Sequence, residues 1–531
     1  MTFLRRNIRI PVDLPPSRIP PLLAHLLDLP VEAIRSWEIV RKGIDARKKP
    51  RIHAVLTVRF TVDASYCRHL RQRRDPDLEP WEPPSPEVIS PVSHPLPVLV
   101  VGMGPAGLFA AHRLLSYGLS VVMVERGGAV EDRAVCCTRF WREGVLDPDC
   151  NVQFGEGGAG TFSDGKLVTR VKDPRVRLVF ETLVSFGAPE EILVAARPHV
   201  GTDRLRRVIR AMRDDLASRG AEIRLRCRLS DLVLDGDRVR GGVLDDREEI
   251  RSDHLLLAPG NSARDTIDML HRRGVSLSTK PFAVGVRVEH PQELIDAIQY
   301  GRMSSPELPP ADYSLAVTDS ATGRGVYSFC MCPGGVVIAA SSEEGGVVTN
   351  GMSFHARRGQ YANSALVVTV GEEDFPGSSP LAGFQFQRVL EERAFAAGGG
   401  GYRAPAEPLL SFLGRRGGVL RSTYRPGVTE YPLESLLPPV VTDHLRRGIQ
   451  SFDRRMRGFI TAEATLVGVE TRTSSPVRIV RDEECRSLSH RGLYPCGEGA
   501  GYAGGITSAA LDGIRVADAI VASVRRGEGG V

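Results

Sequence analysis

The chain has 531 residues and a formal net charge of +5, with 42% hydrophobic and 25% charged residues. This composition is that of a globular protein, and the length exceeds what one hydrophobic core supports, so we expect several domains. No apolar run is long enough to cross a bilayer, and the first residues lack the apolar segment of a secretory signal. We therefore expect a cytoplasmic protein without membrane contacts, and the oligomeric state stays open.

The nine cysteines are scattered along the chain. None forms a C-x-x-C pair, and no cluster of cysteine and histidine has the spacing of metal ligands. The sequence therefore predicts no metal site, and free thiols suit a reducing compartment.

Residues 1–74 have the pattern of a small α+β domain, with a ferredoxin-like arrangement as one candidate. The loop at residues 45–49 is interpreted as a solvated hairpin loop, and a contact with a polyanion or with the cofactor domain predicted after the linker is the alternative. The expected elements are a strand over 7–12, a helix over 19–27, a short helix from Val31, and strands over 36–42 and 53–60.

Basic residues clearly outnumber acidic ones before Trp81. This excess permits an acidic partner such as RNA, but no aromatic pattern of an RNA-reading sheet accompanies it, so nucleic-acid binding is not favoured. Many prolines follow over residues 75–97, which predicts an extended linker and the first domain boundary. These prolines are Pro76, Pro80, Pro83, Pro84, Pro86, Pro91, Pro95 and Pro97.

A buried parallel strand is predicted by the apolar run at residues 98–101, and glycines in G-x-G-x-x-G spacing follow it at once. Each glycine has a separate role in such a turn. We expect Gly102 to form the tight turn, Gly104 to admit a pyrophosphate, and Gly107 to let helix and strand pack closely.

The helix after this turn is expected to begin at Pro105 and Ala106, with its N-terminus facing the phosphates. A second strand ends at Glu125, roughly 20 residues beyond the glycines, where a carboxylate can bind an adenosine ribose. Strand, glycines, helix, strand and acid in this order predict a dinucleotide-binding unit.

A glycine-rich loop follows at residues 151–166. Its glycines let the backbone lie close against an extended ligand, and its hydroxyl side chains offer hydrogen bonds. The candidate contacts in and before this loop are Arg126, Arg133, Gly157, Gly158 and Thr161.

The next segment contains two patterns of helix capping. Thr202 is expected to cap a helix over residues 203–219, and residues 262–265 have the spacing of a capping box. Between them, a β-meander leads to a buried strand that ends in glycine, an order typical of the cofactor domain of glutathione-reductase-like proteins. We assign residues 98–280 to the first part of this domain. Its remaining candidate contacts are Leu229 and Gly260.

The pattern changes over residues 281–484, which we interpret as a β-rich substrate domain. Residues 282–289 and 365–370 alternate like strands, and residues 326–332 and 336–341 have the pattern of a hairpin.

Residues 485–531 are predicted to complete the cofactor domain, with a strand, a second glycine-rich loop and a helix over 506–520. Two such loops suit FAD, because its ribityl chain and isoalloxazine ring need a second cradle. Glu498 is expected to accept hydrogen bonds from the ribityl hydroxyls, and the helix N-terminus would stabilise negative charge on the reduced flavin. The candidate contacts are Gly497, Glu498, Gly504, Gly505 and Ile506.

These segments resemble a family of bacterial and plastid NAD(P)/FAD-dependent dehydrogenases among the glutathione-reductase-like flavoproteins. The resemblance covers most of the chain and implies non-covalently bound FAD. Asn261 departs from it, because similar sequences usually carry histidine there, so the acid–base chemistry of a histidine is missing at this position. The segments that carry the resemblance are residues 100–111, 151–167, 329–335, 340–345, 348–370 and 496–513.

The cysteines do not follow the C-x4-C pattern of disulfide reductases of this fold, since Cys136 and Cys137 are adjacent. Cys330 and Cys332 would face the same side of a strand, either toward a flavin or as small buried apolar side chains. No second strand-linked glycine pattern occurs. NAD(P)H as electron donor would therefore bind without a Rossmann site of its own, or the substrate and an acceptor exchange electrons through FAD directly.

The sequence thus predicts an α/β fold with an FAD-binding Rossmann-like domain, a β-rich substrate domain and a small N-terminal α+β domain. The expected function is that of an FAD-dependent oxidoreductase, which passes electrons between a small organic substrate and a second redox partner. A flavin-dependent monooxygenase, an RNA-associated flavoprotein and a protein with FAD as a structural group are the alternatives. No catalytic residue is assigned.

Overall fold

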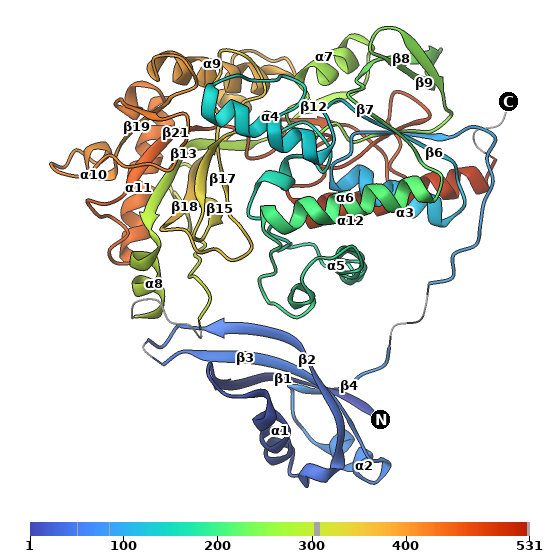
Figure 1. The fold of residues 1–531 in the computed structure, drawn as a ribbon, viewed down its shortest axis with the longest axis vertical. Coiled ribbons are helices and arrows are strands. Elements are labelled where there is room, and N and C mark those ends of the chain that lie inside the picture. The colour runs from blue at the N-terminus through green and yellow to red at the C-terminus, as the bar shows by residue number, and fades with distance from the viewer. Residues whose placement is uncertain (50, 84, 86, 302–307, 528–531) are drawn as a thin grey trace.

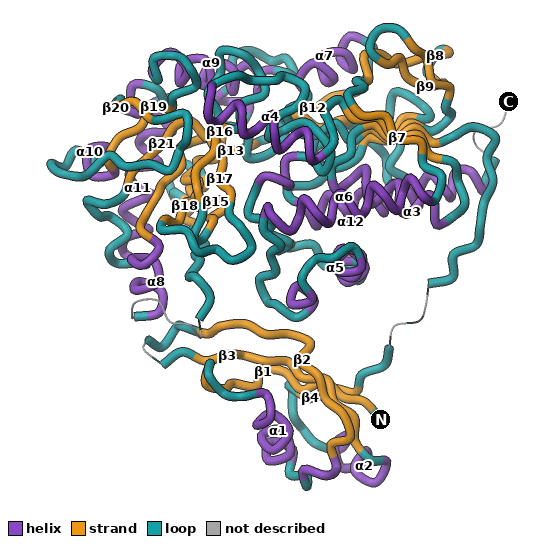
Figure 2. The backbone as a smooth tube through the Cα atoms, viewed as in Figure 1, coloured by secondary structure: helices purple, strands orange, loops and turns teal. Residues whose placement is uncertain are grey.

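The computed structural model describes the chain except residues 50, 84, 86, 302–307 and 528–531. A small N-terminal unit is joined by a long extended segment to two larger units that pack side by side (Figures 1 and 2). Two of the linker prolines, Pro84 and Pro86, and the last four residues of the expected cofactor domain lie outside the described residues.

The N-terminal unit is an antiparallel sheet in the order β2-β3-β1-β4 with two helices on one side (Figure 1). Alternate side chains of β3 are buried, as expected of a strand with one face on a core. The βαββαβ order and this strand order form a split βαβ arrangement, the ferredoxin-like candidate. The elements are β1 (Thr2–Pro11), α1 (Ile19–Leu27), β2 (Ile34–Asp45), β3 (His53–Val62), α2 (Ala64–Gln72) and β4 (Leu78–Pro80).

The extended linker begins later than the prolines indicated. Strand β4 pairs with β1, so that Phe3 lies opposite Pro80, and the Trp81 amide donates to the Thr2 carbonyl at 3.0 Å. Proline is tolerated there because β4 is an edge strand. Residues 75–81 therefore belong to the N-terminal unit.

The β2–β3 side of this unit contacts the rest of the chain. Lys42 makes two backbone hydrogen bonds to the segment before α6, with the Val194 carbonyl at 2.7 Å and the Ala196 amide at 2.8 Å. In the loop, the Lys49 ammonium donates to the Ile298 carbonyl. This contact is made with residue 298, in the region interpreted as the substrate domain, and not with the cofactor domain that was the expected alternative.

The second unit is built on a five-stranded parallel sheet in the order β23-β11-β5-β6-β7. The inner strands β11, β5 and β6 are buried because both faces are covered: α3, α6 and α12 pack on one face, and the meander β8–β10 with α7 packs on the other. Strands β11 and β23 come from distant parts of the chain. The elements are β5 (Val98–Val101), α3 (Pro105–Ser116), β6 (Val121–Glu125), α4 (Val130–Glu143), α5 (Val176–Ser185), α6 (Thr202–Ser218), β7 (Glu222–Leu225), β8 (Leu229–Asp235), β9 (Arg238–Leu244), β10 (Glu248–Arg251), β11 (Leu255–Leu257), α7 (Arg264–Arg272), β12 (Leu277–Thr279), β22 (Val477–Ile479), β23 (Leu493–Pro495) and α12 (Ile506–Arg525).

The third unit contains a seven-stranded sheet in the order β14-β15-β18-β13-β21-β19-β20. Its long central strands, β13 and β18, pair along their full length. The elements are β13 (Phe282–Pro291), α8 (Gln292–Tyr300), β14 (Ala316–Thr318), β15 (Gly325–Cys332), β16 (Val336–Ala339), β17 (Thr349–Met352), β18 (Tyr361–Val370), α9 (Ala382–Ala397), β19 (Ala404–Pro408), α10 (Leu409–Phe412), β20 (Val428–Glu430), α11 (Pro439–Arg455) and β21 (Thr465–Glu470).

The hairpin expected from residues 326–341 does not form. Strand β15 pairs with β14 and β18, whereas β16 pairs with β17 in a separate two-stranded sheet. The backbone leaves the direction of β15 at a bulge before Cys332 and at Gly334, whose φ of 49° lies in the left-handed region. The chain between the two strands therefore turns out of the large sheet instead of folding back along it.

Both capping expectations are corrected. The Thr202 side chain does not cap α6 but donates to the Thr161 carbonyl at 2.7 Å. Helix α7 starts at Arg264 without a side-chain cap, because the Ser262 hydroxyl donates to the Gln153 side chain at 3.1 Å. No helix in the described part of the chain combines the length and apolar character needed to cross a membrane.

The glycine-rich loop is held from behind by Arg133 of α4. The side chain is fully buried, and its guanidinium donates to four backbone carbonyls of the loop at 2.7 to 3.3 Å. A Cβ on Gly155 would lie 2.5 Å from this side chain, so the loop closes tightly around it. The four carbonyls belong to Asn151, Val152, Gly155 and Glu156.

We expect Arg133→Met to lower the free energy of unfolding by about 3 kcal/mol or more, because four carbonyls lose their donor inside the protein. Urea unfolding followed by circular dichroism measures the change. Arg139→Met, at an exposed position of the same helix, is the matched control and should change stability by less than about 0.5 kcal/mol. Equal effects of the two substitutions would contradict this account of the loop.

Candidate functional site

A cavity of about 330 Å³ lies where the parallel sheet meets the seven-stranded sheet. One wall consists of the carboxyl ends of β5, β6 and β23 and the N-termini of α3 and α12. The opposite wall belongs to β15, β17 and β21, which supply Cys330, Asn350 and Glu470. Ligands of open α/β sheets bind at the carboxyl ends of the strands, and the volume is that of a small-molecule site.

Most residues that the sequence assigned to a cofactor line this cavity, although they come from separate segments of the chain. The residues behind the wall are Gly107, Arg133, Gly157 and Thr161, which are not part of the lining. Those that line the cavity are Gly102, Gly104, Pro105, Ala106, Glu125, Arg126, Gly158, Leu229, Gly260, Gly497, Glu498, Gly504, Gly505 and Ile506.

The three glycines after β5 differ in whether the protein itself has room for a side chain at their position. A Cβ on Gly102, whose φ is 96°, would lie 2.2 Å from the Ala258 carbonyl oxygen, and one on Gly107 would lie 1.9 Å from the Gly102 carbonyl oxygen. These two glycines therefore permit backbone packing. A Cβ on Gly104 would have only ordinary contact, 3.7 Å from the Cα of Gly158, so the protein itself does not require glycine there. Gly104 faces the cavity, which suits close approach of a ligand.

Gly157 and Thr161 shape the glycine-rich loop from inside. A Cβ on Gly157 would lie 2.2 Å from the Thr161 hydroxyl oxygen, and Thr161 is fully buried. Both residues therefore maintain the shape of the loop and do not line the cavity.

Glu125 connects three loops at the cavity. Its carboxylate accepts hydrogen bonds from the backbone amides of Met103 at 2.9 Å, Gly127 at 3.0 Å and Gly155 at 2.9 Å. A carboxylate can accept about four hydrogen bonds, so a position for a ribose hydroxyl is left. The sequence pattern indicated the ribose contact and did not reveal these three amides.

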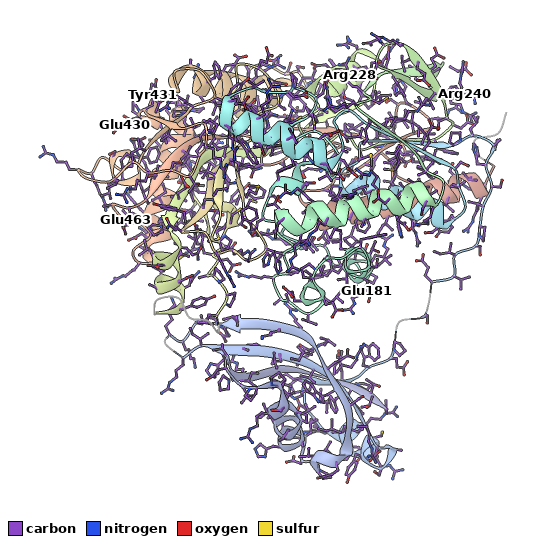
Figure 3. The ribbon with its side chains drawn as sticks, viewed as in Figure 1. Glu181, Arg228, Arg240, Glu430, Tyr431 and Glu463 are labelled. Atoms are coloured by element: carbon purple, nitrogen blue, oxygen red, sulfur yellow. The ribbon has the colours of Figure 1, made fainter. Side chains whose placement is uncertain are left out.

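Arg126 forms the edge of the cavity beside Phe154. Its guanidinium stacks on the Phe154 ring, 4.2 Å from the ring centroid, and it binds both carboxylate oxygens of Asp265 at 2.9 Å. Arg228, labelled in Figure 3, also lines the cavity and donates to Asp265 at 3.2 Å. Phe154 and Arg228 belong to the site without having been assigned to it from the sequence.

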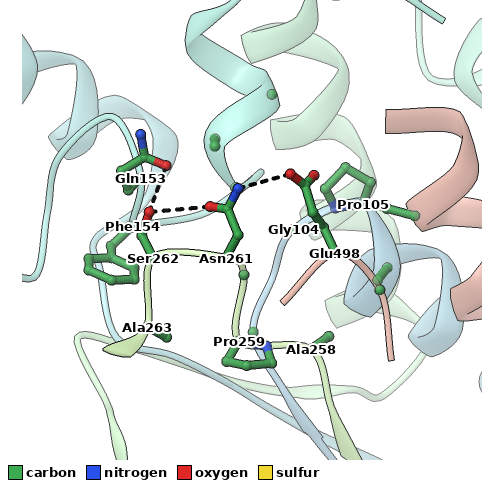
Figure 4. Close-up of a pocket in the computed structure, with 18 of the residues that line it drawn as sticks. Gly104, Pro105, Gln153, Phe154, Ala258, Pro259, Asn261, Ser262, Ala263 and Glu498 are labelled. Atoms are coloured by element: carbon green, nitrogen blue, oxygen red, sulfur yellow. Dashed lines mark hydrogen bonds between the residues drawn. The ribbon is translucent and has the colours of Figure 1, made fainter. Parts of the chain in front are cut away.

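A chain of hydrogen bonds crosses the cavity floor between the two glycine-rich loops (Figure 4). Asn261 donates to the Glu498 carboxylate at 2.9 Å, the Ser262 hydroxyl lies 3.2 Å from the Asn261 side-chain oxygen, and it donates to Gln153 at 3.1 Å. Burial raises the pKa of Glu498 to about 7, while Lys280 and the Asn261 amide oppose this rise. Asn261 thus fixes a carboxyl group that titrates near neutral pH.

The N-terminus of α12 opens into the cavity. A Cβ on Gly504 or Gly505 would meet no protein atom within 4 Å, so the backbone here is free to approach a ligand. No side chain caps the helix. Its unpaired amides and partial positive charge therefore favour an anionic group in front of Ile506.

The opposite wall rests on a buried ion pair. Arg287 is fully buried and binds both carboxylate oxygens of Glu470, at 2.7 and 2.9 Å. Its guanidinium also donates to the Cys330 carbonyl at 3.3 Å and lies 3.4 Å from the Asn350 side-chain oxygen. Lys166 reaches this wall from the glycine-rich loop, between the carboxylate of Asp164 and the Met331 carbonyl.

In the described part of the chain, one group of side chains has the spacing of metal ligands. The ligand atoms of Cys136, Asp147 and Cys150 lie within 4.8 Å of one another, outside the cavity lining. The Arg226 guanidinium lies 3.5 Å from the Asp147 carboxylate, where its charge opposes a cation. The sequence placed these cysteines far apart, and the fold brings them together.

The raised pKa of Glu498 predicts a pH-dependent stability. The folded apoprotein holds this proton more tightly than the unfolded chain does, so stability from this group is present below about pH 4.5 and lost as the pH rises through about 7. Between about pH 4.5 and 7, the free energy of unfolding of the wild type should therefore fall by about 1–3 kcal/mol more than that of Glu498→Gln. Urea unfolding at several pH values measures the difference.

Asn261→Ala is the companion variant. It removes a donor that favours the ionised carboxylate, so the pKa of Glu498 should rise further and the loss of stability should move to higher pH. Identical pH profiles for the wild type and Glu498→Gln would contradict the assignment.

Three family models match the chain. Residues 281–473, which contain the seven-stranded sheet, match "FAD-dependent protein, C-terminal domain-like". Residues 95–135, which contain the glycine turn and Glu125, match "FAD binding domain". Residues 4–61 of the N-terminal unit match a "Domain of unknown function (DUF8436)".

A relative in Clostridium beijerinckii, described as an uncharacterized protein, is 44% identical over 533 residues, which cover 98% of this chain and 99% of the relative. Among solved structures, a flavin-dependent brominase is 15% identical with a TM-score of 0.37 and covers 81% of this chain and 79% of its own. Glycine oxidase from Bacillus cereus is 12% identical with a TM-score of 0.30 and covers 81% and 95%. The activities of these two enzymes are not assigned to this chain. The chain belongs to the family of the Clostridium beijerinckii protein, and it carries an FAD-binding domain and the C-terminal domain of FAD-dependent proteins.

Proposed function

We propose that the protein is an FAD-dependent oxidoreductase that binds FAD non-covalently and passes electrons between a small organic substrate and a second redox partner. The observation that carries this proposal is the continuity of one cavity. It joins the glycine turn after β5, the carboxylate of Glu125 and the N-terminus of α12 to a wall of the seven-stranded sheet.

The residues of the parallel-sheet wall fit a dinucleotide. Gly104 and the N-terminus of α3 would bind the pyrophosphate, and Glu125 would accept a hydrogen bond from the adenosine ribose. Arg126 and Phe154 would contact the adenosine end. Glu498, fixed by Asn261, would accept hydrogen bonds from the ribityl chain.

Bound FAD would supply the two-electron chemistry, and the protein would orient it and stabilise its charge. The N-terminus of α12 favours negative charge in front of Gly504 and Gly505. Glu498, with a pKa of about 7, can hold or release a proton near neutral pH. The helix N-terminus would thus stabilise negative charge, and Glu498 would bind or release a proton, at the end of the cavity that faces β15, β17 and β21.

The substrate would bind between this end and the seven-stranded sheet. Lys166 and Asn350 are polar groups of the cavity lining there, and both are held in place, Lys166 by Asp164 and Asn350 by Arg287. Held polar groups orient a substrate at low entropic cost. The sequence contains no second strand-linked G-x-G-x-x-G turn, so a nicotinamide donor would have to enter the same cavity.

Gly104→Ala and Gly107→Ala form a matched test of the cofactor site. Gly104→Ala should weaken FAD binding by about tenfold or more, because its methyl group points at the ligand and meets no protein atom within 3.4 Å. Gly107→Ala should instead lower the melting temperature of the apoprotein, because its methyl group would lie 1.9 Å from a backbone oxygen. Fluorescence titration with FAD and thermal melting measure the two effects.

The assignment of Gly104 would be overturned if Gly104→Ala bound FAD like the wild type. It would also fail if the substitution lowered the melting temperature as much as Gly107→Ala does.

Redox activity is tested on the purified protein by anaerobic mixing with NADH, NADPH or a panel of small organic donors while the flavin absorbance is followed. We expect FAD to bind in a one-to-one ratio and to be bleached by a donor, then restored by an acceptor. Protein that binds no flavin would refute the cofactor. Bound flavin that dithionite reduces but no biological donor does would favour a structural role instead.

A further inference from the structure

Cys330 and Cys332 lie at an irregular point of β15, where the strand borders the cavity. Phe329 pairs with Ala365 and Cys332 with Asn363, so Cys330 and Met331 both lie opposite the single residue between these partners. This is a β-bulge, a feature that re-aims side chains beside functional sites. Cys330 has a φ of 46°, in the left-handed region that residues other than glycine rarely adopt.

The two sulfur atoms are adjacent but differ in exposure. Cys330 is half-buried and lines the cavity, whereas Cys332 is fully buried behind it. The Cys332 thiol donates a hydrogen bond to the Cys330 carbonyl oxygen at 3.2 Å, which holds it beside the residue whose sulfur borders the cavity. The bulge thus presents one thiol to the cavity and keeps the second bonded to the backbone of the same segment.

The surroundings of the pair favour a thiolate at Cys330. The neighbouring Cys332 thiol, followed by the charges of Lys166 and Arg287, lowers the pKa of Cys330. The neighbouring Cys330 and burial raise the pKa of Cys332. Thiol–disulfide chemistry needs this combination of an accessible thiolate and a neighbouring resolving thiol.

We propose that Cys330 and Cys332 form a redox-active dithiol–disulfide pair that exchanges two electrons with the cofactor in the cavity. This inference rests on the proposed FAD site, and it identifies a redox group of the protein itself beside the flavin. The pair would store electrons between the flavin and a thiol or disulfide substrate that reaches Cys330 from the cavity.

The electron transfer balances without a further reagent. Reduction of the disulfide needs two electrons and one proton, which bound FAD in its reduced, anionic form would supply as a hydride equivalent. The bond between the two cysteine sulfurs breaks and takes up both electrons. Cys332 takes the proton as a thiol, and Cys330 remains a thiolate beside Lys166. The reverse reaction oxidises the dithiol and reduces the flavin.

The other cysteines of the cavity do not offer this arrangement. Cys227 and Cys496 also belong to the lining, and neither has a second cysteine in the same strand or loop segment. Cys136 and Cys150 approach each other outside the cavity lining. Within the described residues, the pair in β15 therefore combines two cysteines one residue apart with access to the cofactor.

Peptide mass spectrometry tests the bond directly. Trypsin should release residues 325–357 as one peptide, because Arg324 and Arg357 flank a segment without lysine or arginine, and Cys330 and Cys332 are its only cysteines. After mild oxidation of the holoprotein and alkylation in denaturant, we expect this peptide to be unalkylated and lighter by two hydrogen atoms than the dithiol form. Two alkylated cysteines after oxidation would overturn the proposal.

Anaerobic reductive titration tests the coupling to the flavin. Oxidised wild-type holoprotein should take up four electrons per flavin, and Cys332→Ser and Cys330→Ser should each take up two. The matched control is Cys67→Ser, in the N-terminal unit and outside the cavity lining, which should take up four. Cys332→Ser keeps Cys330 but cannot form the disulfide within this peptide. It should retain bound FAD.

The two proposals fail in different ways. A chain that binds no FAD refutes the cofactor site, whatever the peptide masses are. A chain that binds FAD but takes up two electrons in the wild type and in both variants refutes the redox pair and leaves the FAD site standing.

Discussion

The structure depends first on one buried carboxylate. Glu125, at the end of β6, accepts hydrogen bonds from backbone amides of the glycine turn, of the segment after β6 and of the glycine-rich loop. A single charged group thereby satisfies three donors that would otherwise be unpaired at the wall of the cavity, where each unpaired donor costs about 1–3 kcal/mol. Arg133 performs the complementary task from behind, because it satisfies four carbonyls of the same loop. Glu125 and Arg133 together hold in place a loop whose glycines would otherwise leave it flexible.

The cavity exists because two sheets of different type meet at one edge. The parallel sheet presents its strand ends and two helix N-termini, which provide amides and partial positive charge for a dinucleotide. The seven-stranded sheet presents side chains over the buried Arg287–Glu470 pair, which keeps Asn350 and the Cys330 carbonyl in place. Between the two lies Glu498, whose burial brings its titration close to neutral pH. The site therefore combines a rigid holder for the cofactor with groups that can move protons and electrons.

The bulge in β15 links the fold to its chemistry. It interrupts the pairing of β15 with β18, which resumes at Cys332 opposite Asn363, and it places Cys330 at the cavity, whose lining does not include Cys332. Regular alternation along a strand would place both side chains on one face, but it would not distinguish an accessible sulfur from a buried one. The pKa of Cys330 is lowered by the neighbouring Cys332 and then by the charges of Lys166 and Arg287, which belong to other segments of the chain, whereas the neighbouring Cys330 and burial raise the pKa of Cys332.

The sequence by itself determined the parts of this protein that short-range physics controls. The apolar run of β5, the three glycines, the start of α3 and Glu125 are local features, since turn geometry and helix N-termini depend on neighbouring residues. The first three strands and the first helix of the N-terminal unit were likewise within reach of hydrophobic periodicity, whereas β4 was not. Only the tertiary structure decided which strands pair and which side chains meet. Asn261 and Glu498 are 237 residues apart. Arg133, a candidate cofactor contact by position, is turned inward by carbonyls of a later loop, and Thr202 and Ser262 bond to distant partners in place of their own helices. Such long-range partners have no signature in local spacing, because their hydrogen bonds form only after the sheets have packed.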